Sequence, residues 1–362
     1  MKTFLKIICL LFSILSDCAL VHGQDDFLPD ERVRLVFLGD IFLGNWAEEF
    51  LRKYGVDYPF RGCADLLTTA DLAIANLEAP ITAGGVPFPD KEFLLKMPPG
   101  SQIGLAEANI RCLNLANNHI MDYGGEGLAA TFKSLDSSNI KYFGAGENLD
   151  SACREAVFDL KGKTFAFIGF STVFPQEFWA TDTTPGTAFP WKEKLAETIS
   201  RCRENYDFII VSFHWSAELR DVPKDYQVEL AHLCVDSGAD IVVGHHPHIP
   251  QGIEFYKGKP IFYSLGNFAF ASYSENAVQA MAAVVDFPKT GGITVRIVPL
   301  NVYNSEVNFR PQPLTGKKKA DFFRRLRALS KELNTENIVI TDTGEIKVSP
   351  IMEGASELNP YR

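Results

Sequence analysis

Residues 33–40 read VRLVFLGD, a mainly apolar run that ends in Gly39 and Asp40. A short apolar run closed by turn residues is typical of a buried β-strand. Asp40 should therefore lie just past the carboxyl end of such a strand. Similar runs predict further strands at residues 72–76, 110–116, 164–170, 208–213, 241–243 and 260–265.

Helical patterns lie between these runs. Residues 127–137 (GLAATFKSLDS), 192–205 and 226–237 are the clearest of them. Strands and helices thus alternate over most of the chain. This alternation predicts a layered α/β fold.

The character of the sequence changes after about residue 266. Residues 278–287 and 292–301, joined by Pro-Lys-Thr-Gly-Gly, predict a hairpin that extends a second sheet. A basic amphipathic helix at 317–334 and a hairpin at 338–348 then close the chain as a covering appendage. We therefore expect a main domain at 24–310 and a C-terminal appendage at 311–362.

The N-terminus has the features of a secretory signal peptide. Lys2 and Lys6 precede the apolar residues 7–15, and small residues follow up to Gly23. Cleavage near Gly23 is favoured, and a lipid anchor at Cys18 is the alternative. Either predicts a secreted, periplasmic or cell-envelope protein. No other segment is long and apolar enough to span a bilayer.

Charge and cysteine content narrow the class of function. Without residues 1–23, 33 basic and 44 acidic residues leave a formal charge of −11. This acidity argues against nucleic acid as a partner. An anionic substrate would need a local positive field, which bound dications could supply. Five cysteines remain, an odd number without CxxC spacing, so we expect core residues rather than a disulfide scaffold.

Four of the seven histidines lie in two short loops, residues 115–124 (LANNHIMDYG) and 243–251 (VGHHPHIPQ). Imidazole, carboxamide and carboxylate groups together suit Zn, Mn or Fe. His and Asn also cap helices and hydrogen-bond turns, which is the structural alternative. Two such loops at strand ends favour a metal site.

The polar residues that follow the predicted strands should meet at one edge of the fold, where ligands bind in α/β proteins. They are Asp40, Asn76, Glu78, Asn117, Asn118, His119, His214, His245, His246 and His248.

Six motifs occur in a fixed order: GDIFLG (39–44), ANLE (75–78), ANNH (116–119), FHW (213–215), GHHPH (244–248) and SLGNF (264–268). Over residues 33–300 the chain resembles the CapA family of poly-γ-glutamate capsule synthesis proteins. Those proteins resemble calcineurin-like metallophosphoesterases. The resemblance implies a four-layer α/β sandwich, with two mixed sheets flanked by helices and a metal site between strand-end loops.

The resemblance also implies a ligand set for one or two divalent ions (Mn, Zn or Fe). Glu78 takes the place of the bridging carboxylate. The implied metal ligands are Asp40, Glu78, Asn118, His214, His246 and His248.

Two positions depart from the pattern. Phe42 stands where phosphoesterases have the histidine of an Asp-x-His motif, which leaves open a weak or empty metal position. Ser216 replaces the glycine of a His-Trp-Gly-x-Glu pattern, while His214 and Glu218 keep their places.

Chemistry suggests roles for the remaining polar residues. His119 would act as a general acid or orient a phosphate, and Asp122 would hold its ring. His245 could be a ligand, a support for one, or a packed side chain. Asn267 either binds a ligand or satisfies backbone groups in a turn. We assign Asn76, Glu218, His245 and Asn267 to substrate binding, and His232, within a helix, to a structural role.

The resulting interpretation is an envelope protein that makes, exports or trims an anionic polymer, with a metal-dependent, phosphoesterase-like hydrolase site. The alternatives are a non-catalytic polymer-binding or assembly component, and hydrolysis of peptide or γ-glutamyl bonds. The expected partners are an anionic polymer or phosphoester and, from the resemblance, membrane proteins of a capsule-synthesis complex. Four aromatic side chains could line a polymer groove, and ordinary packing is the alternative for them. They are Phe174, Phe178, Trp179 and Trp215.

Overall fold

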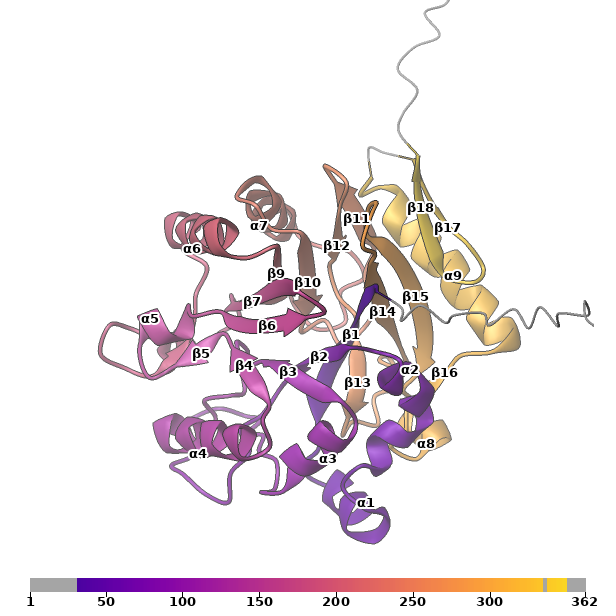
Figure 1. The fold of residues 1–362 in the computed structure, drawn as a ribbon. Helices are drawn as coiled ribbons and strands as arrows, with labels where there is room; N and C mark the ends of the chain where they lie inside the picture. The colour runs from indigo at the N-terminus through magenta and orange to yellow at the C-terminus, as the bar shows by residue number, and fades with distance from the viewer. Residues whose placement is uncertain (1–30, 335–336, 350–362) are drawn as a thin grey trace, which may run out of the picture. The chain divides into compact units, whose positions relative to one another are not determined.

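The computed structural model describes residues 31–334 and 337–349 (Figure 1). The predicted signal peptide, its cleavage site and Cys18 lie outside these residues. None of the described helices is long and apolar enough to cross a membrane.

The predicted strand at 33–38 is longer than expected and lies inside a ten-stranded sheet. It forms β1 (Val33–Phe42), so Asp40 lies within the strand rather than just past it. The extension arises because β13 (Asn267–Phe270) pairs parallel with the end of β1, with Asp40 opposite Asn267. The sheet order is β17-β18-β15-β14-β1-β2-β3-β4, with β13 on β1 and β16 on β15.

The bounds of the other strands in this sheet are β2 (Leu72–Leu77), β3 (Ile110–Asn114), β4 (Lys141–Phe143), β14 (Gln279–Phe287), β15 (Thr294–Asn301), β16 (Gln312–Pro313), β17 (Asn337–Ile340) and β18 (Glu345–Ser349). The predicted hairpin is present as β14 and β15. It joins the first sheet and not a second one, because β14 pairs antiparallel with β1 itself.

A six-stranded mixed sheet has the order β11-β12-β10-β9-β7-β6. Its strands are β6 (Ala156–Leu160), β7 (Lys163–Ser171), β9 (Phe208–His214), β10 (Ile241–His245), β11 (Ile253–Tyr256) and β12 (Lys259–Phe262). A short pair, β5 (Ala145–Gly146) and β8 (Gly186–Thr187), stands apart.

The α-helices are α1 (Ala47–Tyr54), α2 (Ala64–Thr68), α3 (Ser101–Glu107), α4 (Gly124–Ser137), α5 (Leu149–Ala152), α6 (Lys192–Asn205), α7 (Asp225–Asp236), α8 (Asn304–Val307) and α9 (Gly316–Lys331). Two 3-10 helices span Tyr58–Cys63 and Gln176–Phe178. Helix α6 has the bounds expected from the sequence. Helix α4 begins three residues earlier than expected, at Gly124.

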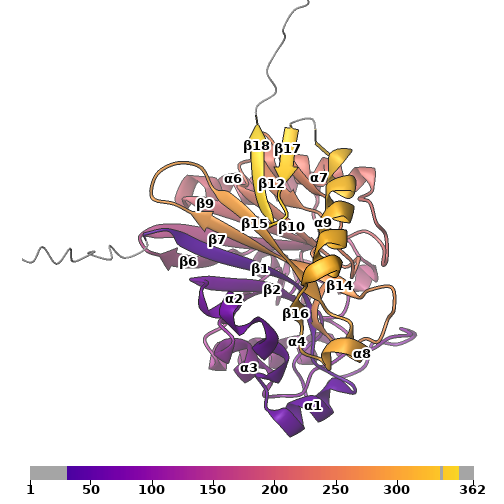
Figure 2. The same cartoon turned by 90° about the vertical axis from the view of Figure 1, so that its right-hand side faces the viewer.

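Three apolar cores define four layers. Phe37 of β1 and Phe167 of β7 belong to a core between the two sheets. Leu38 of β1 packs in a second core with helices α1 to α4, and Val211 of β9 in a third with α6 and α7. Helices α1 to α4 on one side, and α6 and α7 on the other, accordingly lie on opposite outer faces (Figures 1 and 2). This arrangement confirms the predicted sandwich of two mixed sheets flanked by helices.

Helix α9 covers one edge of the core between the sheets. Its Phe322, Phe323 and Leu326 belong to that core. Ser330 Oγ accepts a hydrogen bond of 3.0 Å from the Ile253 N–H of β11. Figure 2 shows α9 running beside β17 and β18, which continue the ten-stranded sheet. The boundary at residue 310 stays a prediction.

All five cysteines that follow the predicted signal peptide are buried and free of disulfides, as expected of core residues. Burial raises the pKa of the Cys63 thiol to about 12. The five are Cys63, Cys112, Cys153, Cys202 and Cys234.

Candidate metal centre

The polar strand ends of both sheets meet at one site. Asp40 of β1 is opposite Asn76 of β2 and Asn267 of β13, all in parallel register. His214 at the end of β9 is likewise opposite His245 at the end of β10. Because parallel strands point their carboxyl ends in one direction, each sheet delivers a row of polar side chains to the same region. The ten-stranded sheet supplies the carboxylates and the six-stranded sheet most of the imidazoles.

Two motif glycines allow the chain to pass closely behind these side chains. A Cβ atom on Gly39 would lie 1.7 Å from the carbonyl oxygen of Gly266, which accepts the Asp40 N–H at 3.0 Å. A Cβ on Gly244 would lie 2.0 Å from the carbonyl oxygen of Tyr263. The glycines that precede the aspartate and the histidines are therefore steric requirements of the site.

Asp40 is fully buried and surrounded by polar groups. Its oxygens lie 3.2 Å from His245 Nδ1 and 3.3 Å from His248 Nδ1, and Oδ1 accepts a hydrogen bond of 2.9 Å from Asn76 Nδ2. Burial raises the pKa of Asp40, but hydrogen bonds and charges from His245 and His248 outweigh it. The pKa of this carboxyl consequently lies well below its usual range, so Asp40 is ionised.

Glu78 is the carboxylate between the two sheets. Its Oε1 lies 3.7 Å from His214 Nε2 and 3.7 Å from His248 Nε2. Oε1 has no hydrogen-bond partner among the described residues, while Oε2 accepts from Asn76 Nδ2 at 3.2 Å. Burial, followed by the charge of Asp40, holds the pKa of Glu78 well above its usual range. A buried carboxylate oxygen that accepts no hydrogen bond destabilises the folded protein unless a cation binds to it.

The donors at this site fit divalent metal ions. Two groups of three side chains each bring one donor atom within 4.8 Å of the others, and Glu78 belongs to both groups. His246 Nδ1 is also buried without a hydrogen-bond partner in the described part of the chain. Carboxylate oxygens and imidazole nitrogens suit Zn, Mn or Fe. The groups are Asp40, Glu78 and His214, and Glu78, His246 and His248.

The histidines show the conformational and electrostatic features of a ligand site. His246 and His248 have φ angles of 93° and 61°, the left-handed region that side chains rarely adopt. Burial, and then the charge of His248, lowers the pKa of His246 to about 3, which leaves the neutral imidazole that binds metals. Burial lowers the pKa of His248, but Glu78 and Asp40 together raise it to about 10. His214 is held neutral, with a pKa lowered mainly by burial.

The two neighbouring asparagines of the 115–124 loop have different surroundings. Asn118 Oδ1 lies 2.8 Å from His214 Nε2, beside the group that contains Asp40. Asn117 Oδ1 instead accepts the backbone N–H groups of His119 and Ile120, at 3.1 and 2.9 Å. Asn118 is therefore placed to serve as a ligand, whereas Asn117 holds the turn.

His119 is held by Asp122 as the sequence suggested. Its Nδ1 lies 2.7 Å from Asp122 Oδ2, which also accepts the Leu95 N–H at 2.7 Å. Burial lowers the pKa of His119, partly opposed by the hydrogen bond to Asp122. Because Nδ1 is occupied by Asp122, Nε2 is the nitrogen left for a ligand or proton.

Lys91 is a site residue that the sequence reasoning missed. Its ammonium donates to Asp122 Oδ1 and to the carbonyl oxygen of Asn118, and lies 3.1 Å from His119 Nδ1. Burial lowers the pKa of Lys91, partly offset by the Asp122 charge. Lys91 comes from the segment between β2 and α3, far in sequence from any histidine, so no local motif could have identified it.

The four predicted substrate-binding residues have different positions. Asn267 and Glu218 line the cavity above the site, and Asn267 Oδ1 lies 2.9 Å from His248 Nδ1. Asn76 and His245 are buried behind the carboxylates and are absent from the cavity lining. Asn76 also accepts from Asn114 Nδ2 at 3.1 Å. It therefore fixes the carboxylates from behind.

Ser216 shows why glycine is usual at its position. Its φ is 80°, a left-handed conformation that glycine adopts without strain. The Ser216 N–H donates to the Tyr226 hydroxyl at 2.7 Å, which holds the turn. Despite this departure from the family pattern, Glu218 still lines the cavity and His214 still belongs to one of the two groups of candidate metal ligands.

A cavity of about 520 Å³ opens onto the candidate centre. Phe42 lines it and packs against Phe270, with ring centroids 5.5 Å apart. The side chains that carry its chemistry are Phe42, Lys91, Phe93, Asn118, His119, Glu218, His248, Asn267 and Phe270.

The four aromatic residues that the sequence offered for a polymer groove do not line the cavity, and ordinary packing, the alternative, is confirmed for Trp215 and Phe178. Trp215 and Phe178 are buried in the apolar cores, and Phe174 and Trp179 are also absent from the cavity lining. Trp215 is instead fixed by its indole N–H, which donates to the Tyr263 carbonyl at 2.9 Å. His232 is structural, as predicted: it stacks on Tyr256 and contacts Glu254 Oε1 at 2.8 Å.

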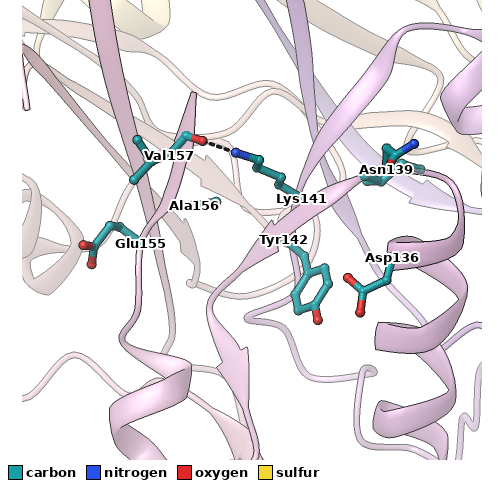
Figure 3. A pocket seen from close by; sticks show the side chains of 8 residues that line it. Asp136, Asn139, Lys141, Tyr142, Glu155, Ala156 and Val157 are labelled. Carbon is teal, nitrogen blue, oxygen red and sulfur yellow. Dashed lines mark hydrogen bonds between the residues drawn. The ribbon is translucent and has the colours of Figure 1, made fainter. Parts of the chain in front are cut away.

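A second hollow, of about 490 Å³, lies between β4 and β6 (Figure 3). Two of its charged side chains already have partners. Lys141 donates to the carbonyl oxygen of Val157, and Glu155 accepts from Arg201 and from the Tyr206 hydroxyl. The hollow contains none of the candidate metal ligands.

Sequence comparison identifies relatives with a stated role. Residues 34–272 match the family described as "Bacterial capsule synthesis protein PGA_cap". The chain is 32% identical over 310 residues to the capsule biosynthesis protein CapA of Bacillus anthracis, covering 84% of this chain and 74% of the relative. It is 32% identical, again over 310 residues, to the PGA biosynthesis protein CapA of Bacillus subtilis (strain 168), covering 84% and 80%.

Solved structures share only a general likeness. The NAD nucleotidase of Haemophilus influenzae has a TM-score of 0.48 at 13% identity, covering 84% of this chain and 57% of that protein. A 5'-nucleotidase precursor from Thermus thermophilus has a TM-score of 0.45 at 16% identity, covering 83% and 59%. The chain spans less than two thirds of either protein, and scores this low add nothing to the description of the fold.

The family match covers the elements that carry the candidate centre, from β1 to the loop after β13. It confirms the resemblance seen in the six motifs. The chain belongs to the family of bacterial capsule synthesis proteins, PGA_cap.

Proposed function

We propose that this protein is a metal-dependent hydrolase that acts on an anionic polymer, or on a phosphoester, during poly-γ-glutamate capsule synthesis. One observation carries the proposal: Glu78 is shared by two buried groups of metal-ligating side chains beneath an open cavity. Such a bridging carboxylate is the basis of a two-metal hydrolytic site.

The chain supplies carboxylate, amide and imidazole groups that could hold the ions of such a centre. Bound divalent ions would neutralise an anionic substrate and provide Lewis-acid activation of water. The residues that would hold them are Asp40, Glu78, Asn118, His214, His246 and His248.

His119 is the proposed proton donor. It lines the cavity, and Asp122 fixes its ring through Nδ1, so that its imidazolium form would donate the Nε2 proton to a leaving oxygen and become the neutral ring. Lys91 contacts the same Asp122 and lines the same cavity, where its charge complements an anionic group. Glu218 and Asn267 border the remaining space and would contact the rest of the substrate.

The place of action is part of the proposal. The N-terminal sequence has the composition of a secretory signal, and the relatives are named for capsule or PGA biosynthesis. These points support action in the periplasm, in the cell envelope or outside the cell, together with membrane proteins of a capsule-synthesis complex. Release by cleavage near Gly23 is preferred to a lipid anchor at Cys18.

A non-catalytic polymer-binding role is the second candidate, and Phe42 is the observation that favours it. Its apolar ring is buried at the position two residues after Asp40, where the superfamily pattern has a histidine ligand. A site that holds one ion weakly could bind an anionic chain without cleaving it. Cleavage of γ-glutamyl bonds at the same centre is the other hydrolytic option.

The test is to incubate the full chain with Mn or Zn and measure turnover of an aryl phosphate and of poly-γ-glutamate. Chelator-sensitive turnover that His119→Ala reduces, with bound metal retained, would support a hydrolase and identify the bond it cleaves. Metal binding without turnover of either substrate would favour the polymer-binding component.

A further inference from the structure

A row of aromatic rings begins at the mouth of the cavity. Tyr273 stacks on Trp46, with ring centroids 4.4 Å apart, and Trp46 contacts Phe50 at 5.7 Å. Phe50 in turn lies 6.1 Å from Tyr58, which stacks on Tyr54 at 4.7 Å. We call these five rings the aromatic row. It is built by helix α1, the 3-10 helix after it and the loop after β13.

The row is continuous with the candidate metal centre. Asn45, which precedes Trp46, lines the cavity, as do Ser272 and Ser274 on either side of Tyr273. On the inner side of that mouth, the Phe270 ring lies 4.9 Å from His248. A chain with one end at the metal centre would therefore leave the cavity beside Tyr273 and Trp46.

The rings are accessible. Tyr54 and Tyr273, at opposite ends of the row, are 41% and 52% exposed. Trp46, Phe50 and Tyr58 are partly exposed between them. Flat apolar surfaces of this kind pack well against methylene groups or planar amides.

Cations flank the row although the protein as a whole is acidic. Lys53 Nζ lies 4.9 Å from the Tyr54 ring centroid, and the Arg310 guanidinium lies 5.9 Å from that of Tyr58. Arg61 is also close to Tyr58, but it forms a salt bridge with Asp57. In the part of the chain that the structure describes, Lys53 and Arg310 form no salt bridge with a carboxylate. They therefore supply two uncompensated positive charges beside apolar rings.

We propose that the aromatic row is a binding surface for a flexible polyanion whose end lies in the cavity. Its ligand would be a chain that carries carboxylates on aliphatic units, such as poly-γ-glutamate. The rings would pack against the methylene and amide groups of that chain, while Lys53 and Arg310 pair with its carboxylates. This inference rests on the proposed function for the nature of the ligand, and it adds the path that the ligand follows.

Neighbouring ring centroids in the row lie 4.4–6.1 Å apart, more than the rise of about 3.3–3.6 Å per unit of an extended α-linked chain, so the five rings would contact several units of a bound chain. Affinity should therefore depend on chain length. The probes are end-labelled γ-linked glutamate chains, one a trimer and one long, with binding measured by fluorescence polarisation on the full chain. The long chain should bind at least about tenfold more tightly than the trimer, a difference of about 1.4 kcal/mol.

Variants then show which side chains provide the higher affinity for the long chain. The double variant Trp46→Ala/Tyr273→Ala should reduce long-chain affinity to about that of the trimer. Tyr54→Ala, an exposed change with little effect on folding, should remove part of the gain. Lys53→Gln/Arg310→Gln should make long-chain binding less sensitive to salt, because fewer ion pairs form.

Trp191→Ala is the matched control, because Trp191 is exposed in a separate aromatic cluster with Trp179 and Phe189. If Trp191→Ala lost as much long-chain affinity as the variants of the aromatic row, the proposal would be overturned. Equal binding of trimer and long chain, or equally tight binding of neutral dextran, would also overturn it. Bound metal per chain, measured on each variant, confirms that the fold is intact.

The two proposals fail separately. Metal-dependent turnover without length-dependent binding would refute the aromatic row alone. Length-dependent binding that the ring variants abolish, in a protein without turnover, would refute the hydrolase and leave the row in place.

Discussion

Asn76 donates a hydrogen bond of 2.9 Å to Asp40, its register partner on the neighbouring strand. The same amide nitrogen lies 3.2 Å from Glu78 Oε2. One fully buried asparagine thus holds two carboxylates side by side, where their mutual repulsion would otherwise drive them apart. Two carboxylates this close together are stable only when protons or cations lie nearby. Protons and metal ions therefore compete for the site, so metal binding should depend on pH.

Metal affinity should rise with pH. In the metal-free protein the pKa of Glu78 is raised, chiefly by burial, and that of His248 is raised to about 10 despite burial. His248 therefore holds a proton at neutral pH, and an incoming ion must displace it. Each displaced proton gives about a tenfold increase in affinity per pH unit below the pKa of its group.

Titration calorimetry in buffers with different ionisation enthalpies would count these protons. The expected result is release of at least one proton per ion bound, with tighter binding at pH 8 than at pH 6. Affinity that does not change between these two values would contradict the electrostatic description of the site.

Asp122→Asn should lower turnover without removing metal. The carboxylate orients His119 and accepts from Lys91, yet it is not among the proposed ligands. Loss of such a supporting partner typically costs about 10–100-fold in activity. Steady-state kinetics and elemental analysis of the same preparation would test this. Asp90→Asn, an exposed carboxylate next to Lys91, is the control and should behave as wild type.

Gly39→Ala should destabilise the protein strongly. The new methyl would lie 1.7 Å from the carbonyl oxygen of Gly266, which is backbone and cannot turn aside. Overpacking of this kind typically costs about 1–3 kcal/mol and sometimes more. Gly84→Ala, where no atom lies within 4 Å of the new Cβ, is the matched control and should stay within about 0.5 kcal/mol of wild type. Urea unfolding of both would show the difference; equal midpoints would refute the close approach of β1 and β13.

Phe42→His should strengthen metal binding. Phe42 lines the cavity and is separated from Asp40 by one residue, at the position where the superfamily pattern has a ligand. If this apolar ring limits one metal position, an imidazole there should raise the chelator concentration needed to remove metal by about tenfold. Unchanged chelator sensitivity would show that Phe42 does not limit metal binding.

Local patterns predicted a layered α/β fold, and the resemblance to the CapA family implied its four layers and most of the site. Apolar runs ending in polar residues marked β1, β9 and β10, and the carboxyl ends of these strands bring Asp40, His214 and His246 together. Lys91 could not be found in this way. It reaches His119 from a segment without regular structure, where neither periodicity nor spacing constrains a side chain.

The sheet that the hairpin joins could not be predicted from local patterns. Residues 279–301 show the pattern of a hairpin, but which sheet they join depends on long-range pairing with β1. Trp215, within the FHW motif, and Phe178, in a 3-10 helix, pack in the apolar cores, which is the alternative that the sequence left open. The aromatic residues at the cavity are Phe42 and Phe270, which are brought together by the pairing of β1 with β13.

The central claim is that Glu78 joins two groups of metal ligands, and metal stoichiometry of Glu78→Gln tests it most directly. Glutamine has nearly the size and shape of glutamate, and burial raises the pKa of Glu78 because it disfavours the charged form, so an uncharged amide at this position should preserve the fold. Elemental analysis should find divalent metal in the wild-type full chain and in Glu92→Gln, an exposed control at the cavity, and should find it lost from Glu78→Gln. Metal content in Glu78→Gln equal to that of the wild type would contradict the account.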